Sequence, residues 1–99
     1  VLLNVTAFGM EPQDALDAPR FRTRSVPSSF APHEAEPGVL WLEASLHGRS
    51  GIELAAHGYE VVRQPDLYND FGSVGAIFVE TDGWTAVADP REATWAMAR

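Results

Sequence analysis

The sequence contains no cysteine and no lysine. Without cysteine, the chain itself can form no disulfide bond, thiolate zinc site or cysteine nucleophile. Without lysine, a Schiff-base mechanism and the lysine of a phosphate-binding P-loop are excluded. These absences leave the redox compartment open, and the sequence indicates no cellular location.

The sequence also lacks a basic excess and a long apolar run. Its formal net charge is −7, and its seven basic residues, all arginines, are scattered along the chain. Because phosphate binding requires a basic patch, we expect no nucleic-acid partner. The longest apolar stretches fall far short of the roughly 20 residues that span a bilayer, so we expect no membrane segment. The hydrophobic content of 45% and aromatic content of 10% are typical of a globular protein.

The chain opens with the apolar sequence VLLNVTAF, without an initiating methionine or the basic segment of a signal peptide. An apolar first turn is unusual at a terminus that would normally fray in solvent. A length of 99 residues fits one small domain or a piece of a larger one. We therefore expect the chain to have been cut from a longer protein.

Two helices are predicted in the first 18 residues, where apolar residues recur at helical spacing before Gly9 and again between Pro12 and Pro19. Residues 20–38 are rich in proline, glycine and serine and predict an extended loop, with a possible short strand at 21–23. The apolar run 39–43 predicts a strand buried on both faces. Ser50 and Glu53 match a capping box, so a helix is predicted to start at Ser50 and to stop at Gly58.

Three further strands are predicted over residues 59–62, 74–80 and 84–88, the last two joined by a hairpin turn at Asp82-Gly83. Residues 93–99 form either a short helix or an extended tail. The predicted fold class is therefore layered α/β (α+β), with one helix layer on a mostly antiparallel sheet of four or five strands. Residues 1–99 are expected to form a single unit.

No local pattern marks an active site. His33, His47 and His57 lack metal-ligand spacing, so we expect no metal site, and no sequence feature requires a cofactor. None of the six serines lies in a G-x-S-x-G motif, and Ser50 is better explained as a helix cap. The acidic residues of the predicted loops are expected to be solvated surface charges; they are Glu34, Glu36, Asp66, Asp70 and Asp82.

Three charged residues are different because they adjoin prolines at the ends of apolar segments. Arg20 follows Ala18-Pro19, and Asp89 and Arg91 flank Pro90 after the last strand. A charge at such a place is costly unless it is paired. We expect an ion-pair or backbone-capping role for Arg20, Asp89 and Arg91 rather than a catalytic one.

Three stretches resemble the C-terminal part of the γ-glutamyltransferase family. LLNVTAFGMEPQDALDAPRF (2–21) resembles the family's helix and APRF element. PGVLWLE (37–43) with GIELAAHGYEV (51–61) is similar to its strand–helix–strand, although Tyr59 stands where histidine is commoner. GSVGAIFVETDGWTAVADPR (72–91) resembles the closing hairpin, which ends in ADPR.

The resemblance implies a fragment of the family's αββα Ntn-hydrolase sandwich. In that family the precursor cleaves itself, and the new N-terminal threonine of the small subunit attacks a γ-glutamyl group, as in glutathione, beside two oxyanion-hole glycines. The threonine, the glycines and the glutamate-binding residues precede this segment in family order, so the resemblance implies no catalytic or substrate-binding residue in the chain. It implies that the partners are the large subunit and the N-terminal part of the small subunit.

Two functional hypotheses remain open from the sequence. The chain is either the structural C-terminal portion of a γ-glutamyl transferase or hydrolase, or a free-standing, non-catalytic binding or assembly domain. In the first case the missing half of the sandwich would leave apolar surface uncovered, so self-association of the isolated chain is possible.

Overall fold

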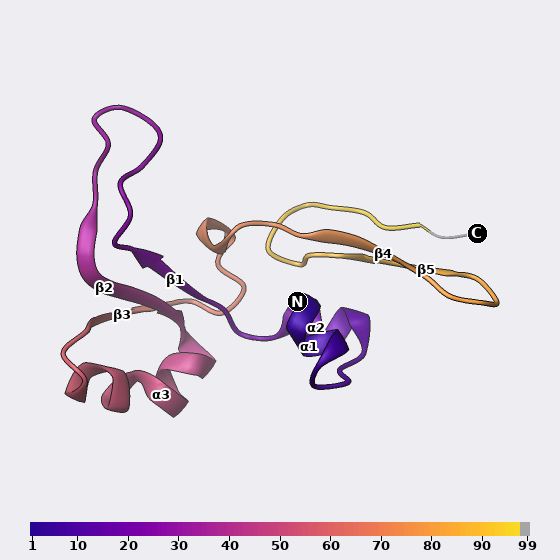
Figure 1. Ribbon diagram of the computed structural model, residues 1–99, viewed down its shortest axis with the longest axis horizontal. Coiled ribbons are helices and arrows are strands. Elements are labelled where there is room, and N and C mark those ends of the chain that lie inside the picture. The colour runs from indigo at the N-terminus through magenta and orange to yellow at the C-terminus, as the bar shows by residue number, and fades with distance from the viewer. Residues whose placement is uncertain (98–99) are drawn as a thin grey trace. The chain divides into compact units, whose positions relative to one another are not determined.

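A computed structural model describes residues 1–97 of the chain. These residues form two compact units, which are described separately. The hairpin unit comprises residues 1–18 together with the segment from residue 72 onward, and the βαβ unit comprises residues 19–71 (Figure 1). Over residues 1–97, no helix has the length and hydropathy needed to cross a membrane.

The hairpin unit begins with two short helices, α1 (Leu2–Thr6) and α2 (Pro12–Asp17). Gly9 has a φ of 65°, a left-handed conformation that glycine adopts at little cost, and its amide N–H donates to the carbonyl of Val5 at 3.2 Å. Pro12 starts α2 because its ring fixes a helical φ and its missing N–H is not needed in the first turn. Both predicted helices are confirmed, with α1 shorter than the apolar pattern indicated.

Strands β4 (Gly75–Val79) and β5 (Trp84–Ala88) complete the hairpin unit as an antiparallel pair. The turn between them is closed by the amide of Glu80, which donates to the carbonyl of Gly83 at 2.8 Å. Helix α2 packs against β5 and buries Leu16 completely, with 0% exposure. The predicted hairpin is therefore confirmed, and it forms the small core of this unit with α2.

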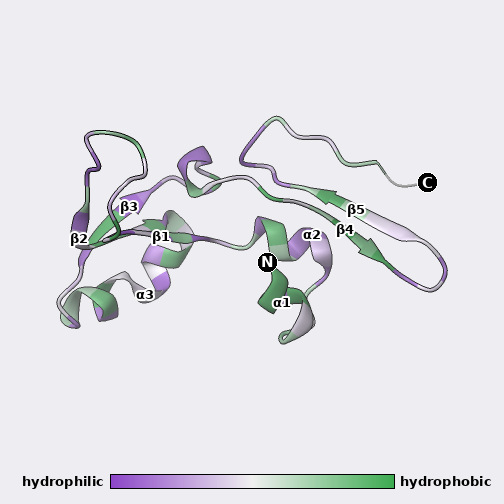
Figure 2. Ribbon diagram, turned by 45° about the horizontal axis from the view of Figure 1, so that its top comes forward, coloured by the Kyte–Doolittle hydropathy of each residue, from purple (hydrophilic) through white to green (hydrophobic). Residues whose placement is uncertain are grey.

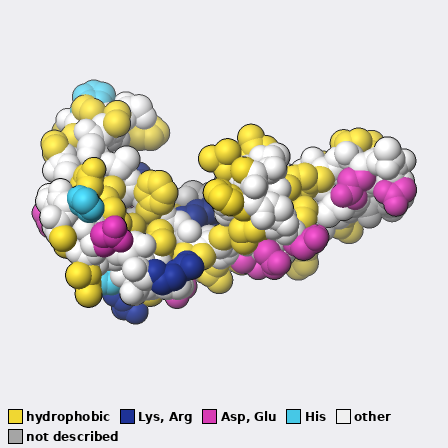
Figure 3. All heavy atoms as spheres, turned by 60° about the horizontal axis from the view of Figure 1, so that its bottom comes forward, with side chains coloured by type: hydrophobic (Ala, Val, Ile, Leu, Met, Phe, Trp, Pro, Cys, Tyr) yellow, Lys and Arg dark blue, Asp and Glu magenta, His cyan; other side chains and the backbone are white. Residues whose placement is uncertain are grey.

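The second face of the hairpin carries exposed apolar side chains. Ile77 pairs with Ala86, and Val79 pairs with Trp84, so their side chains share one face. Ile77, Val79 and Trp84 are 64%, 74% and 61% exposed. Figure 2 shows hydrophobic colouring on α1, β4 and β5, and Figure 3 shows hydrophobic side chains spread over the displayed surface. A two-stranded hairpin is only marginally stable by itself, and contiguous exposed apolar surface usually marks an interaction site.

The βαβ unit contains a three-stranded sheet in the order β1-β2-β3. Strand β1 (Phe21–Arg24) pairs antiparallel with β2 (Glu36–Glu43), which pairs parallel with β3 (Glu60–Gln64). Helix α3 (Ala44–Ala56) connects the parallel strands, as a parallel crossover requires, and packs against both of them. A single 3-10 turn, η1 (Asn69–Phe71), lies near the end of the unit.

The start of α3 differs from the prediction. The helix begins at Ala44 directly after β2, so Ser50 lies in its interior and is not the N-cap. The capping box fails because the first turn is capped from a distant part of the chain: the amide and the hydroxyl of Ser45 both donate to Oδ1 of Asp66. The predicted stop is confirmed, since Gly58 has a φ of 94° and follows the C-cap residue His57.

The sheet also differs from the prediction in detail. The strands form two separate sheets of three and two strands rather than one of four or five, although the pairing is mostly antiparallel as expected. Strand β2 begins at Glu36, and only Leu42 and Glu43 of its apolar run are buried. The guanidinium of Arg24 lies over the ring of Trp41, which is half-buried. The predicted burial on both faces is therefore found only at the end of the strand. After a turn at 90–93, residues 94–97 are irregular, which excludes a helix there; 98 and 99 lie outside the described residues.

Candidate functional site

The most deeply buried charges of the hairpin unit are Asp89 and Arg91, at the end of β5. Nη1 of Arg91 lies 3.2 Å from Oδ1 of Asp89, and both side chains have 0% exposure. Oδ1 also accepts the amide N–H of Arg91 at 3.1 Å, and Oδ2 accepts the amide N–H of Val74 at 3.0 Å. The carboxylate therefore joins the segment that follows β5 to the segment that enters β4.

The guanidinium of Arg91 caps the C-terminal end of α2. Nη1 donates to the carbonyl of Leu16 at 2.8 Å, and Nη2 donates to the carbonyl of Ala18 at 3.1 Å. The last carbonyls of a helix have no partner within the helix and carry the negative end of its dipole, so a cation there is doubly favoured. The ion pair thus connects α2 with both ends of the hairpin.

Arg20 belongs to the βαβ unit, whereas Asp89 and Arg91 belong to the hairpin unit. The amide N–H of Arg20 donates to Oε2 of Glu43 at 3.0 Å, and its carbonyl accepts the amide N–H of Glu43 at 3.0 Å. Oε1 of Glu43 accepts the amide N–H of Tyr68 at 3.2 Å. Glu43 is only 1% exposed, and its carboxylate holds together the entry to β1, the end of β2 and the segment before η1.

Sequence reasoning missed Glu43 because it treated the residue as the last member of an apolar strand. The signal was nevertheless present, since Glu43 is a charge at the end of an apolar run, like Asp89. It also missed Asp66, which is exposed as expected but caps α3 through Ser45. Every buried side-chain nitrogen or oxygen within residues 1–97 has a hydrogen-bond partner. The buried charges are thus engaged in holding the backbone.

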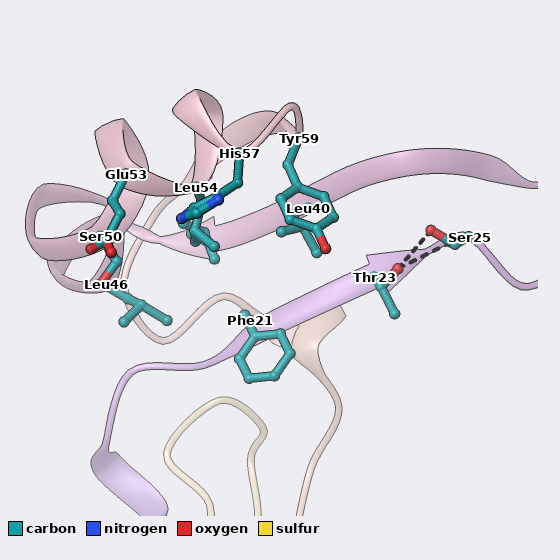
Figure 4. A pocket seen from close by; sticks show the side chains of 11 residues that line it. Phe21, Thr23, Ser25, Leu40, Leu46, Ser50, Glu53, Leu54, His57 and Tyr59 are labelled. Atoms are coloured by element: carbon teal, nitrogen blue, oxygen red, sulfur yellow. Dashed lines mark hydrogen bonds between the residues drawn. The ribbon is translucent and has the colours of Figure 1, made fainter.

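An apolar groove of about 750 Å³ lies in the βαβ unit, between β1 and α3. Figure 4 shows Phe21 from β1, Leu40 from β2 and Leu54 from α3 among the side chains that line this groove. The lining residues are Phe21, Thr23, Ser25, Leu40, Leu42, Leu46, Ser50, Glu53, Leu54, His57 and Tyr59.

The polar residues of the groove do not form a catalytic constellation. Ser50 and Glu53 of α3 and the C-cap residue His57 line the groove, but within the described residues no side-chain hydrogen bond links any two of them. A nucleophile needs a base within hydrogen-bond reach, and the base needs a group that orients it. No group of three or more histidine, cysteine, aspartate or glutamate side chains in residues 1–97 could hold a metal ion. The leucine and aromatic side chains among its lining residues suit the groove to apolar packing.

Comparisons with known proteins agree with this architecture. The family described as gamma-glutamyltranspeptidase matches residues 1–98 of the chain. The comparison with curated proteins gives no match. The solved structure of LmbA2991HD is 28% identical with a TM-score of 0.86, over 99% of this chain and 18% of that one.

Two further solved structures have the same fold. Gamma-glutamyltranspeptidase from Pseudomonas nitroreducens, complexed with L-DON, is 26% identical with a TM-score of 0.70, over 97% of this chain and 45% of that one. Cephalosporin acylase from Bacillus halodurans has a TM-score of 0.70 at 21% identity, over 99% of this chain and 16% of that one, which shows a shared fold alone. The chain spans less than half the length of each.

The predicted fold class, part of an Ntn-hydrolase with mixed α/β layers, is thereby confirmed. The family match covers nearly the whole chain, including the segments that end in APRF and ADPR. The chain therefore belongs to the γ-glutamyltranspeptidase family.

Proposed function

We propose that residues 1–99 are the structural C-terminal portion of the small subunit of a γ-glutamyl transferase or hydrolase. The threonine nucleophile, the oxyanion-hole glycines and the glutamate-binding residues would then lie in the preceding part of the parent protein. Both compact units of residues 1–99 would together act as one portion of that subunit, and their partners would be the large subunit and the rest of the small subunit.

The observation that carries this proposal is that the buried charged side chains bind one another and the main chain. Asp89 and Arg91 contact each other and the main chain around α2 and β4, and Glu43 contacts the main chain of Arg20 and Tyr68. None of these buried charges lines the groove. We assign Arg20, Asp89 and Arg91 the role of structural support, because their contacts fix the ends of helices and strands rather than a reacting group.

The parent reaction would be acyl transfer. The threonine hydroxyl would attack the γ-glutamyl carbonyl, the leaving amine would take up a proton, and water or an amino-acid amine would release the γ-glutamyl group. This chain would contribute no atom to those steps. It would supply strands and a helix that hold the catalytic portion in place.

An assay with a γ-glutamyl anilide chromogen tests this proposal. The purified chain should release no more anilide than buffer, whereas the parent protein, expressed from the complete reading frame, should turn the substrate over. Turnover by the chain alone that survives Arg20→Ala and Arg91→Ala would reveal an active site within residues 1–99. A start codon directly before Val1 would also contradict the proposal.

A further inference from the structure

Helix α3 leaves part of its sheet uncovered. It packs against β2 and β3, and the groove described above lies where α3 faces β1. A three-stranded sheet is roughly 14 Å wide, whereas a helix with its side chains is roughly 10 Å across. One helix therefore covers about two strands, and the third strand needs another cover.

The uncovered strip is apolar along the floor and along the wall formed by α3. Phe21 on β1 is 67% exposed and pairs with Leu42 of β2, and Thr23 pairs with Leu40. Leu46 and Leu54 line the same groove from α3. From Phe21 to Ser25 the chain advances four strand steps, roughly 13 Å, which equals the rise of roughly nine helical residues.

We propose that the groove is the binding site of a second, amphipathic helix. This helix lies beside α3 over β1 and belongs to the parent protein outside residues 1–99. This inference rests on the proposed function, because it requires such a parent. A helix suits the groove better than a strand. The floor is the face of the sheet, which offers no free backbone groups to a strand, whereas a helix satisfies its own.

The chain's own short helices do not fit the groove. Helices α1 and α2 have five and six residues, fewer than the length of the groove calls for. The apolar residues of α2, Ala15 and Leu16, are already buried within the hairpin unit. The solved relatives, of which this chain spans 18% and 45%, have ample additional chain to supply the helix.

The rim of the groove predicts the charge of the incoming helix. Glu53 and His57 lie on the α3 side, and His57 is the C-cap residue, at the negative end of the helix dipole. An arginine or lysine on the incoming helix would be favoured beside Glu53 and that helix end. The occupant is therefore an apolar-faced helix with at least one basic residue at its edge.

Photo-cross-linking in the parent protein tests this inference. p-Benzoylphenylalanine replaces Phe21 in one variant and Tyr59 in another; both positions are exposed aromatics, so the folded chain should tolerate the probe. Ile52, which is 88% exposed and does not line the groove, carries the probe in a control variant. After irradiation, mass spectrometry locates the captured residues, and mixing of nitrogen-14 and nitrogen-15 protein identifies capture of a second copy.

The expected result is that Phe21 and Tyr59 capture one segment outside residues 1–99, at positions roughly six to nine residues apart, as helical rise requires. The Ile52 control should not capture that segment. Captured positions roughly four apart would indicate a strand and overturn the inference. The inference would also be overturned if the probes captured residues 1–18, a second copy, two unrelated segments or nothing. Capture of the same segment by the Ile52 control would overturn it as well.

Turnover of the γ-glutamyl anilide, measured on the same preparations before irradiation, separates the two proposals. A parent that turns over substrate without the expected capture leaves the proposed function standing and overturns the helix. If the parent protein gives the expected cross-links but does not turn over the substrate, the result supports the proposed helix and counts against the proposed function.

Discussion

Arg20 and Glu43 bind each other reciprocally: the amide of Arg20 donates to the carboxylate of Glu43, and the amide of Glu43 donates to the carbonyl of Arg20, each at 3.0 Å. The second carboxylate oxygen accepts the amide of Tyr68. One buried side chain thereby fixes three chain segments that are far apart in the sequence.

Replacement of Glu43 by glutamine should destabilise the chain by about 1–3 kcal/mol, because the new NH₂ group faces an amide donor that loses its acceptor. The free energy of unfolding in urea measures this change. Glu60→Gln on the exposed side of β3 is the matched control and should change the stability by less than about 0.5 kcal/mol. Equal effects of the two substitutions would contradict the role assigned to Glu43.

Removal of the Asp89 carboxylate should be more costly. Asp89→Ala leaves the buried guanidinium of Arg91 without its ion-pair partner and the amide of Val74 without its acceptor. Loss of one partner of a buried pair typically costs about 3–5 kcal/mol. Urea unfolding should show this loss, whereas Glu92→Ala, at an exposed position, should have little effect. A loss below about 1 kcal/mol would show that the pair does not hold α2 to the hairpin.

The two interpretations of the start of α3 make opposite predictions. Asp66→Ala removes the acceptor of Ser45 and should cost about 1 kcal/mol, the usual value of a helix cap. Ser50→Ala, inside the helix, should be neutral or slightly stabilising because alanine is the better helix former. Thermal unfolding followed by circular dichroism compares them. A loss of about 1 kcal/mol of stability for Ser50→Ala, with none for Asp66→Ala, would show that Ser50 caps the helix and that Asp66 does not.

The isolated chain should bind a hydrophobic dye and self-associate through the apolar face of its hairpin. The double variant Ile77→Thr with Val79→Thr keeps β-branched side chains but removes apolar surface. It should therefore lower both dye binding and the weight-average molecular mass measured by analytical ultracentrifugation. Val26→Thr is a control at a similarly exposed apolar position in the βαβ unit. A chain that is monomeric and binds no dye before any substitution would contradict this prediction.

Sequence reasoning succeeded where the determinants are local. Gly58 and the Asp82-Gly83 turn act through the conformations of one or two residues, so the end of α3 and the hairpin were predictable. The start of α3 was not, because its capping residue Asp66 lies 21 positions after Ser45. The division into two sheets depends on pairings between distant segments, which no local pattern specifies. Asp89 and Arg91 were identified by the cost of burying a charge; the same argument applies to Glu43.

The central claim is that the reacting nucleophile lies outside residues 1–99, and covalent labelling tests it most directly. The parent protein is treated with an electrophilic γ-glutamyl analogue that forms a stable adduct, and peptide mass spectrometry locates the modified residue. The account predicts a single modified threonine in the part of the parent that precedes Val1, with residues 1–99 unmodified. An adduct on any residue from Val1 to Arg99 that forms in step with the loss of turnover would contradict it.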